Sequence, residues 1–260
     1  MIRRSAFSNR VRLAVTQLED RVVPSGMIEV REWVGDSGTQ YLNITGDKYD
    51  NHVRVSPSGA DMIVTSNTGP IKYTTSAGTS TISSGPLVLP ADIWSRLATQ
   101  LRVYGLRGND NLEVIGDVWA VIYIEGAEGN DRVFLDAMTN QCDISTGAGS
   151  DIVEIWNSQV LFFTVSTDPS LPSKGNDRVT LRGTNSFFKL EVFLGAGDDV
   201  LEGDTTPGAG LLPLSRSVAG EPPMLYLKLF GGVGKDTILN AAYFQPPGAV
   251  VSIWDFETIR

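Results

Sequence analysis

The sequence predicts an all-β fold, a right-handed parallel β-helix or β-roll solenoid with coils of about 20–22 residues. Three observations predict it. A loop rich in glycine and acidic residues recurs along the chain, the intervals between its copies are nearly constant, and two short apolar runs fill each interval. Such a unit cannot bury its apolar face alone, so we expect it to gain stability by stacking on its neighbours.

The recurring loop has a glycine two residues before an acidic residue and an aliphatic residue two after it. The acidic positions are Asp110, Asp131, Asp151, Asp177, Asp199 and Asp236, and a degenerate copy has Asn51 in that place. Successive intervals from Asp110 are 21, 20, 26, 22 and 37 residues. The longest contains a Pro/Gly-rich stretch that we interpret as an inserted loop. An interval near 21 residues corresponds to one turn of a solenoid.

Each interval holds two runs with strand character. After Asp110, for example, residues 112–114 and 120–124 are separated by a short polar break. Alternation of Val, Ile, Phe and Tyr with polar residues indicates half-buried strands. After residue 26, helical character is confined to residues 91–99. An antiparallel sandwich would also have short, evenly spaced strands, but its turns need not resemble one another, so the repeated loops favour the solenoid.

We divide the chain into a leader or disordered N-terminus at 1–26 and a solenoid domain at 27–260. The domain is expected to comprise degenerate coils at 27–100, regular Gly-Asp coils at 101–203, the inserted loop at 204–223, and a last coil with a cap at 224–260. The leader lacks the continuous apolar segment of an ordinary secretory signal. Its ending, Leu-Glu-Asp-Arg at 18–21 followed by Pro24, resembles the leader of large surface proteins of some environmental bacteria, and this resemblance implies export.

Composition excludes several function classes. The formal net charge is −9, which argues against a nucleic-acid partner, because phosphates require cationic neutralisation. The acidic surplus suits metal cations or plain solubility. Cys142 and His52 are single residues of their kinds, so we expect no disulfide framework or thiolate zinc cluster, a buried Cys142, and His52 at a strand end. No apolar run reaches the roughly 20 residues that span a bilayer.

The loops resemble the haemolysin-type (RTX) calcium-binding repeat, Gly-Gly-x-Gly-x-Asp followed by x and an aliphatic residue. Residues 231–238 match the full unit, the other copies lack one or both leading glycines, and the resemblance covers roughly residues 105–240. It implies Ca²⁺ between the loops of successive coils, held by carboxylates and by carbonyls of the glycine turn. The candidate metal residues are Asp110, Asp131, Asp151, Asp177, Asp199, Asp236, Gly108, Gly129, Gly149, Gly197, Gly234, Asn109, Asn130 and Asp198.

Elementary chemistry agrees with that implication but leaves an alternative. Calcium is a hard cation that takes about 6–8 oxygens, and glycine permits the turn that points carbonyls inward. Because the family uses tandem nine-residue units and this chain has one Gly-Asp loop per coil, a row of ions would lie along one edge only. Asn and Asp also bond their own backbone in turns, so a β-helix with Asn/Asp ladders and no metal would have the same pattern.

We therefore expect a calcium-binding, secreted or cell-surface solenoid with a structural or adhesive role and no catalytic activity. The alternatives are a carbohydrate-active β-helix that binds or cleaves acidic polysaccharide, and a metal-free scaffold. The expected partners are calcium ions, with extracellular polysaccharide or other surface proteins as further candidates. An exposed aromatic row, or clustered basic and acidic side chains on one sheet face, would favour a carbohydrate ligand. We expect Trp33, Trp119, Trp156 and Trp254 to pack in the core or cap coil ends, with sugar stacking as the alternative.

Overall fold

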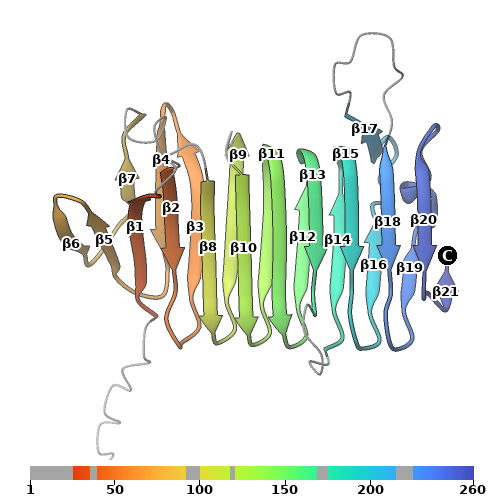
Figure 1. The fold of residues 1–260 in the computed structure, drawn as a ribbon, viewed down its shortest axis with the longest axis horizontal. Helices are drawn as coiled ribbons and strands as arrows, with labels where there is room; N and C mark the ends of the chain where they lie inside the picture. The colour runs from red at the N-terminus through yellow and green to blue at the C-terminus, as the bar shows by residue number, and fades with distance from the viewer. Residues whose placement is uncertain (1–25, 36–39, 92–99, 118–120, 169–174, 215–224) are drawn as a thin grey trace, which may run out of the picture.

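The chain forms a β-solenoid of stacked parallel coils (Figure 1), which confirms the predicted fold class. The structure is a computed structural model that describes residues 26–35, 40–91, 100–117, 121–168, 175–214 and 225–260. Residues 1–25 of the leader expected at 1–26, nearly all of the helical window at 91–99, and Trp119 lie outside these ranges. No helix in the described ranges is long and apolar enough to cross a membrane.

Two sheets of parallel strands form the walls of the solenoid. The first sheet contains β2 (Gln40–Thr45), β8 (Gln100–Arg107), β10 (Val121–Glu128), the second half of β11 (Arg132–Ala148), β13 (Gln159–Ser166), β15 (Thr184–Phe193), β18 (Tyr226–Phe230) and β20 (Val250–Trp254). The second contains β3 (His52–Ser58), β9 (Asn111–Asp117), the first half of β11, β12 (Ile152–Trp156), β14 (Arg178–Arg182), β16 (Val200–Gly203), β19 (Thr237–Leu239) and β21 (Thr258–Ile259).

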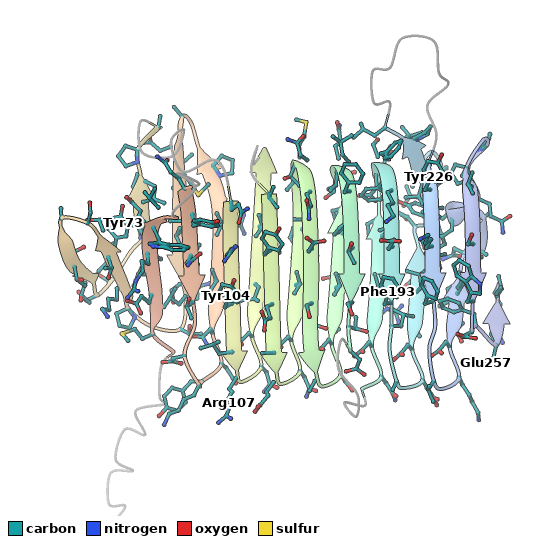
Figure 2. The ribbon with its side chains drawn as sticks, in the orientation of Figure 1. Tyr73, Tyr104, Arg107, Phe193, Tyr226 and Glu257 are labelled. Atoms are coloured by element: carbon teal, nitrogen blue, oxygen red, sulfur yellow. The ribbon has the colours of Figure 1, made fainter. Side chains whose placement is uncertain are left out.

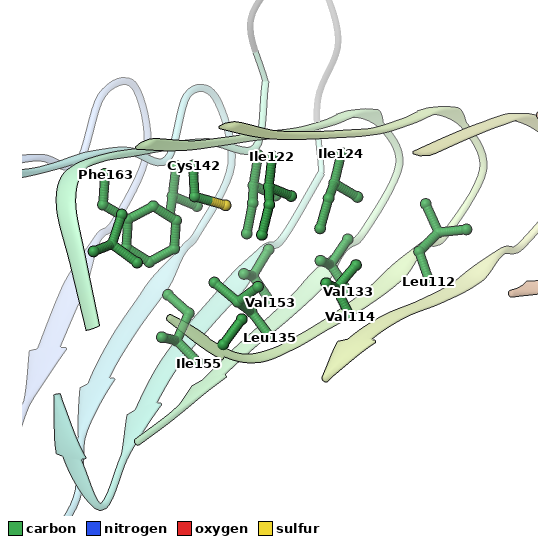
Figure 3. Packing of buried hydrophobic residues seen from close by; sticks show 14 of the residues in the cluster. Leu112, Val114, Ile122, Ile124, Val133, Leu135, Cys142, Val153, Ile155 and Phe163 are labelled. Atoms are coloured by element: carbon green, nitrogen blue, oxygen red, sulfur yellow. The ribbon is translucent and has the colours of Figure 1, made fainter. Parts of the chain in front are cut away.

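The core lies between the two sheets and follows from the period-two pattern. In β10 and β11, alternate residues such as Ile122, Val133, Leu135 and Cys142 are fully buried, and their neighbours face outward. Parallel register places like residues of successive coils above one another, so Val133 aligns with both Leu112 and Val153. The result is a continuous column of aliphatic side chains (Figure 3) that no single coil could form alone.

The N-terminal part differs from the degenerate coils expected over 27–100. Only β2 and β3 continue the parallel stack there, through their pairing with β8 and β9. The remaining strands are β1 (Ile28–Val34), β4 (Asp61–Ser66), β5 (Ile71–Thr75), β6 (Gly78–Ile82) and β7 (Leu87–Leu89). They form the antiparallel pairs β1–β2, β3–β4, β5–β6 and β4–β7, and β1 also pairs in parallel with β5. A tight turn at Gly59, with φ 63°, reverses the chain between β3 and β4.

Two further differences concern the strand breaks. Each interval was expected to hold two separate strands, but the polar stretch at 136–140 is part of β11, which passes from the second sheet to the first without interruption. The expected inserted loop at 204–223 contains a strand, β17 (Gly210–Pro213), which pairs in parallel with the start of β15. A 3-10 turn, η1 (Ala241–Phe244), follows β19 and buries Tyr243 and Phe244 against the core.

Candidate functional site: the Gly-Asp edge

The Gly-Asp loops lie along one edge of the solenoid, where the chain passes from a first-sheet strand to the next second-sheet strand. The structure brings the six predicted aspartates into a single row there. Their side chains are almost wholly buried, with at most 2% of the residue exposed. We call these residues the ladder aspartates; they are Asp110, Asp131, Asp151, Asp177, Asp199 and Asp236.

Each ladder aspartate accepts a hydrogen bond from the main chain of the coil before it. The N–H of Asp110 donates to Oδ1 of Asp131 at 2.8 Å, and the N–H of Asp131 donates to Oδ1 of Asp151 at 2.7 Å. The same bond joins Asn51 to Asp110, Asp151 to Asp177, Asp177 to Asp199, and Asp199 to Asp236, at 2.7–3.0 Å. These six bonds form the inner ladder.

A second series of bonds runs in the opposite direction on the outer side of the same edge. It uses the residue just before each ladder position, and the main-chain N–H now belongs to the later coil. The N–H of Asn130 donates to Oδ1 of Asn109, and the N–H of Ser150 donates to Oδ1 of Asn130, both at 2.8 Å. This outer ladder comprises Asp50, Asn109, Asn130, Ser150, Asn176, Asp198 and Lys235.

A column of glycines lets the loops stack this closely. A Cβ on Gly129 would lie 1.7 Å from the carbonyl oxygen of Gly108, and one on Gly149 would lie 1.8 Å from that of Gly129. No real Cβ approaches an oxygen so closely, so from Asn109 onward the position one residue before each outer-ladder residue requires glycine, whereas Tyr49 occupies that position before Asp50 at the start of the column. Gly175, Gly197 and Gly234 meet the preceding glycine of the column in the same way, at 1.5–1.6 Å.

The second carboxylate oxygen of each ladder aspartate is buried and has no hydrogen-bond partner in the described part of the chain. Oδ2 of Asp131 faces Gly126, where a Cβ would lie 2.2 Å from Oδ2 and 2.6 Å from the carbonyl oxygen of Thr146. Two acceptors therefore approach one small space without a donor between them. At the first rung, Asn51 has an amide nitrogen in the corresponding place, and this nitrogen donates to the carbonyl of Tyr49.

Burial raises the pKa of the ladder carboxyl groups. Desolvation is the largest cause at Asp131 and raises its pKa to about 7, against the opposing effect of the hydrogen bond from Asp110. Desolvation likewise raises the pKa of Asp199 to about 7 and the pKa values of Asp110 and Asp177 to about 6. Neighbouring carboxylates of the row add to these shifts, because like charges oppose ionisation. The pKa values of Asp151 and Asp236 are also raised, mainly by desolvation.

The donor set suits Ca²⁺ in kind but falls short in number. Calcium takes about 6–8 oxygens. In coils such as that of Asp131, Oδ1 already accepts a main-chain N–H, as does the outer-ladder oxygen of Asn130, which leaves Oδ2 as the free side-chain oxygen. The described ranges contain no group of three or more His, Cys, Asp or Glu residues that could hold a metal ion. In this arrangement, carbonyl oxygens would have to supply most of a calcium shell.

Sequence reasoning missed several residues of this edge. The acceptor role of Asp50, Ser150 and Asn176 could have been found, because a residue with a side-chain oxygen precedes nearly every ladder aspartate. A shorter ladder on the opposite edge was also missed: Ser158 N–H donates to Oδ1 of Asn185 at 2.8 Å, and Thr184 N–H donates to Oδ1 of Asn157 at 3.2 Å. Each of these two bonds joins residues that lie 27 apart in the sequence, which is longer than the usual interval of about 21 residues between coils.

Other predicted residues are placed as follows. Cys142 is buried, as expected, and burial raises its pKa. His52 opens β3, and its Nε2 lies 3.0 Å from Oε1 of Glu113. Of the placements expected for Trp33, Trp156 and Trp254, packing in the core is wrong, because these residues are 50%, 40% and 42% exposed.

Comparison of the chain with protein families, with curated proteins and with solved structures found no match. The assignment of a role therefore rests on the geometry of the solenoid and its edge.

Proposed function

We propose that this protein is a structural or adhesive β-solenoid of the cell exterior, a scaffold whose Gly-Asp edge is held by protein groups and which performs no catalysis. The observation that carries the proposal is the pair of opposed ladders. Each contains six main-chain N–H donors bonded to side-chain oxygens of an adjacent coil. The inner bonds satisfy buried main-chain donors, the outer bonds satisfy exposed ones, and together they fix the register of the stack.

Two further features support an exported scaffold. The leader resembles that of bacterial surface proteins, and the acidic excess of −9 suits a solvent-exposed solenoid. Export is tested by following the tagged full-length chain in its native host. We expect most of it in the medium or at the cell surface, and retention inside the cell would contradict the proposed location.

The scaffold proposal is tested by thermal unfolding in a calcium chelator, followed by circular dichroism. We expect β-rich ellipticity and one cooperative transition without any metal, because the ladders need none. A chain that is unfolded in chelator and folds only on adding Ca²⁺ would overturn the proposal. A matched magnesium sample separates a specific calcium effect from general screening of the acidic surface.

Calcium binding at the same edge is the second candidate, and the six buried Oδ2 atoms without partners favour it. A cation that binds only the folded chain stabilises it by about 2.7 kcal/mol at a hundredfold excess over the dissociation constant. If this candidate holds, millimolar Ca²⁺ raises the melting temperature and equilibrium dialysis finds bound calcium. Asp131→Ala then lowers the stoichiometry more than Asp236→Ala does, because Asp131 has regularly spaced neighbours on both sides. Equal melting temperatures in chelator and in Ca²⁺ would show that calcium does not bind and stabilise the folded chain.

A further inference from the structure

The outer face of the first sheet contains a hollow of about 550 Å³. It lies over β8, β10, β11 and β13, and its lining includes Arg102, Tyr104, Tyr123, Glu125, Asp143 and Ser145. These are outward-facing residues, so the hollow is separate from the buried Gly-Asp ladders.

The register of the sheet explains why the face is hollowed at this point. Tyr104, Glu125, Ser145, Ser166 and Phe193 occupy equivalent places on successive coils. The small side chains of Ser145 and Ser166 therefore lie between the longer side chains of Glu125 and Phe193. Figure 2 shows Tyr104 and Phe193 at the same level of the solenoid. The hydroxyl groups of these serines therefore form the bottom of the hollow, and longer side chains form its sides.

Aromatic and cationic groups continue from one wall of the hollow. The Arg102 guanidinium lies 4.6 Å from the ring centre of Tyr41 and 5.5 Å from that of Tyr123. Tyr41 in turn stacks on Trp33 at 4.9 Å. These contacts hold the Arg102 side chain and the Tyr123 ring in place at the rim, so the wall is arranged before any ligand arrives.

The far side of the same face has a second aromatic row. Phe193, Phe230 and Trp254 stack with ring centres 4.7 and 4.5 Å apart and ring planes within 10° of parallel. They belong to the column that contains Tyr104 and Glu125. One sheet face therefore has aromatic side chains at both ends of a polar hollow.

The polar groups of the hollow can bond hydroxyl groups. Glu125 is exposed and forms no hydrogen bond or ion pair within the described part of the chain. Asp143 accepts from Nε2 of Gln141 at 2.7 Å and keeps further acceptor capacity, while Arg102 supplies donors. With two carboxylates and one guanidinium, the hollow has a formal charge of −1, in a chain of −9. An anionic ligand would be repelled.

We propose that this face binds a neutral polysaccharide. Sugar rings present apolar C–H faces that stack on aromatic rings and a rim of hydroxyl groups that bond carboxylates and guanidinium. The coil spacing of a parallel sheet, about 4.8 Å, is comparable with the length of one sugar unit, so an extended glycan can meet equivalent positions on successive coils. This proposal adds a ligand to the scaffold role, and it places that ligand on the outer face of the first sheet, away from the Gly-Asp edge.

The test is isothermal titration of the full chain with neutral hexasaccharides of glucose, mannose and xylose, and with oligogalacturonate as the anionic probe. We expect binding of at least one neutral hexasaccharide and none of oligogalacturonate. Tyr104→Ala and Tyr123→Ala should each weaken the neutral ligand about tenfold, since each removes a stacking surface. Trp156→Ala removes an exposed aromatic ring from the second sheet and should leave the affinity unchanged.

Glu125→Gln separates the charge from the shape of the hollow. A neutral glycan should bind about fivefold more weakly, because its hydroxyl groups lose a charged acceptor. Stronger binding of oligogalacturonate than of the neutral sugars, increased further by Glu125→Gln, would overturn the assignment to neutral glycans. Absence of binding to every probe would overturn the site. Tyrosine variants that keep the ellipticity of the folded chain and bind the neutral glycan as tightly as the unaltered chain would also overturn it. Loss of self-association in Tyr104→Ala without any sugar binding would instead identify the face as a contact between copies of this chain.

Discussion

The two oxygens of each ladder aspartate have different surroundings. Oδ1 of Asp131 accepts the N–H of Asp110, whereas Oδ2 is buried against Gly126 without a partner. One oxygen therefore stabilises the edge, and the other opposes ionisation. Asn51 shows how an amide satisfies the same position, since it has a donor where the aspartates have Oδ2.

The first residue-scale prediction separates these two oxygens. Asp131→Ala leaves the buried N–H of Asp110 without its acceptor, and we expect a loss of about 1–3 kcal/mol in the free energy of unfolding. Asp131→Asn retains Oδ1 and removes the buried charge, so its cost in chelator should be below about 1 kcal/mol. Urea unfolding at pH 8 measures both. Equal destabilisation by the two variants would show that the hydrogen bond to Oδ1 does not determine the stability of this rung.

The second residue-scale prediction concerns pH. A carboxyl with a higher pKa in the folded chain binds more protons when folded, so its contribution to stability falls as pH rises between the unfolded and folded values. For Asp131 the window runs from the ordinary aspartate pKa of 3.8 to about 7, and for Asp110 from 3.8 to about 6. Without metal, the melting temperature should therefore be higher at pH 5 than at pH 8.

Groups with lowered pKa values do not obscure that window. Asp204, whose pKa is lowered to about 2 mainly by the hydrogen bond from the Gly183 N–H, loses its contribution only at lower pH. The double variant Asp131→Asn with Asp199→Asn should show a smaller fall in melting temperature between pH 5 and pH 8, because it lacks the two carboxyl groups with pKa values near 7. A melting temperature that is constant or rises over this range in the unaltered chain would contradict the burial of ionisable carboxyls at the edge.

At the scale of the coil, close stacking depends on the glycine column. Gly129→Ala places a methyl group against the carbonyl oxygen of Gly108 and should cost about 3 kcal/mol or more, since the backbone on both sides is fixed by the ladders. Gly78→Ala is the matched control: its φ of 141° is close to the 139° of Gly129, but no atom lies within 4 Å of the added Cβ. The control should show only the backbone strain, about 1–2 kcal/mol. Similar losses in the two variants would exclude coil contact as the cause.

The sequence predicted the coils well where one loop chemistry recurred at a constant interval. The period near 21 residues and the alternation around Asp110 and Asp131 determine the stack, because parallel register repeats side chains from coil to coil. The antiparallel hairpins of β1 and β4–β7 were not predicted, because alternation marks a strand without indicating the direction of its partner. The ladder bonds could not be predicted either, since the same Asn-Asp pair suits a metal loop and a hydrogen-bonded turn.

At the scale of the whole molecule, the solenoid is nearly one-dimensional. Each coil contacts its neighbours, so stability is a sum of coil and interface contributions. The two ladders run through all regular coils and on to Asp236, whose N–H bonds Glu257 beyond the last rung. An edge of this kind can keep the sheet faces in register and leave the outer face of the first sheet free to meet a ligand.

Amide hydrogen exchange at the ladder positions tests the central claim most directly. The N–H groups of Asp110, Asp131, Asp151 and Asp177 are buried donors to the next carboxylate, so in chelator they should exchange as slowly as amides in the middle of β10 and β11. The N–H of Ala77, in the turn between β5 and β6, donates only to the exposed hydroxyl of Thr75 at 3.1 Å and provides the faster reference. Slow exchange at the four ladder amides without metal is the predicted result. Exchange as fast as that of Ala77, slowed only by added Ca²⁺, would contradict an edge held by protein groups alone.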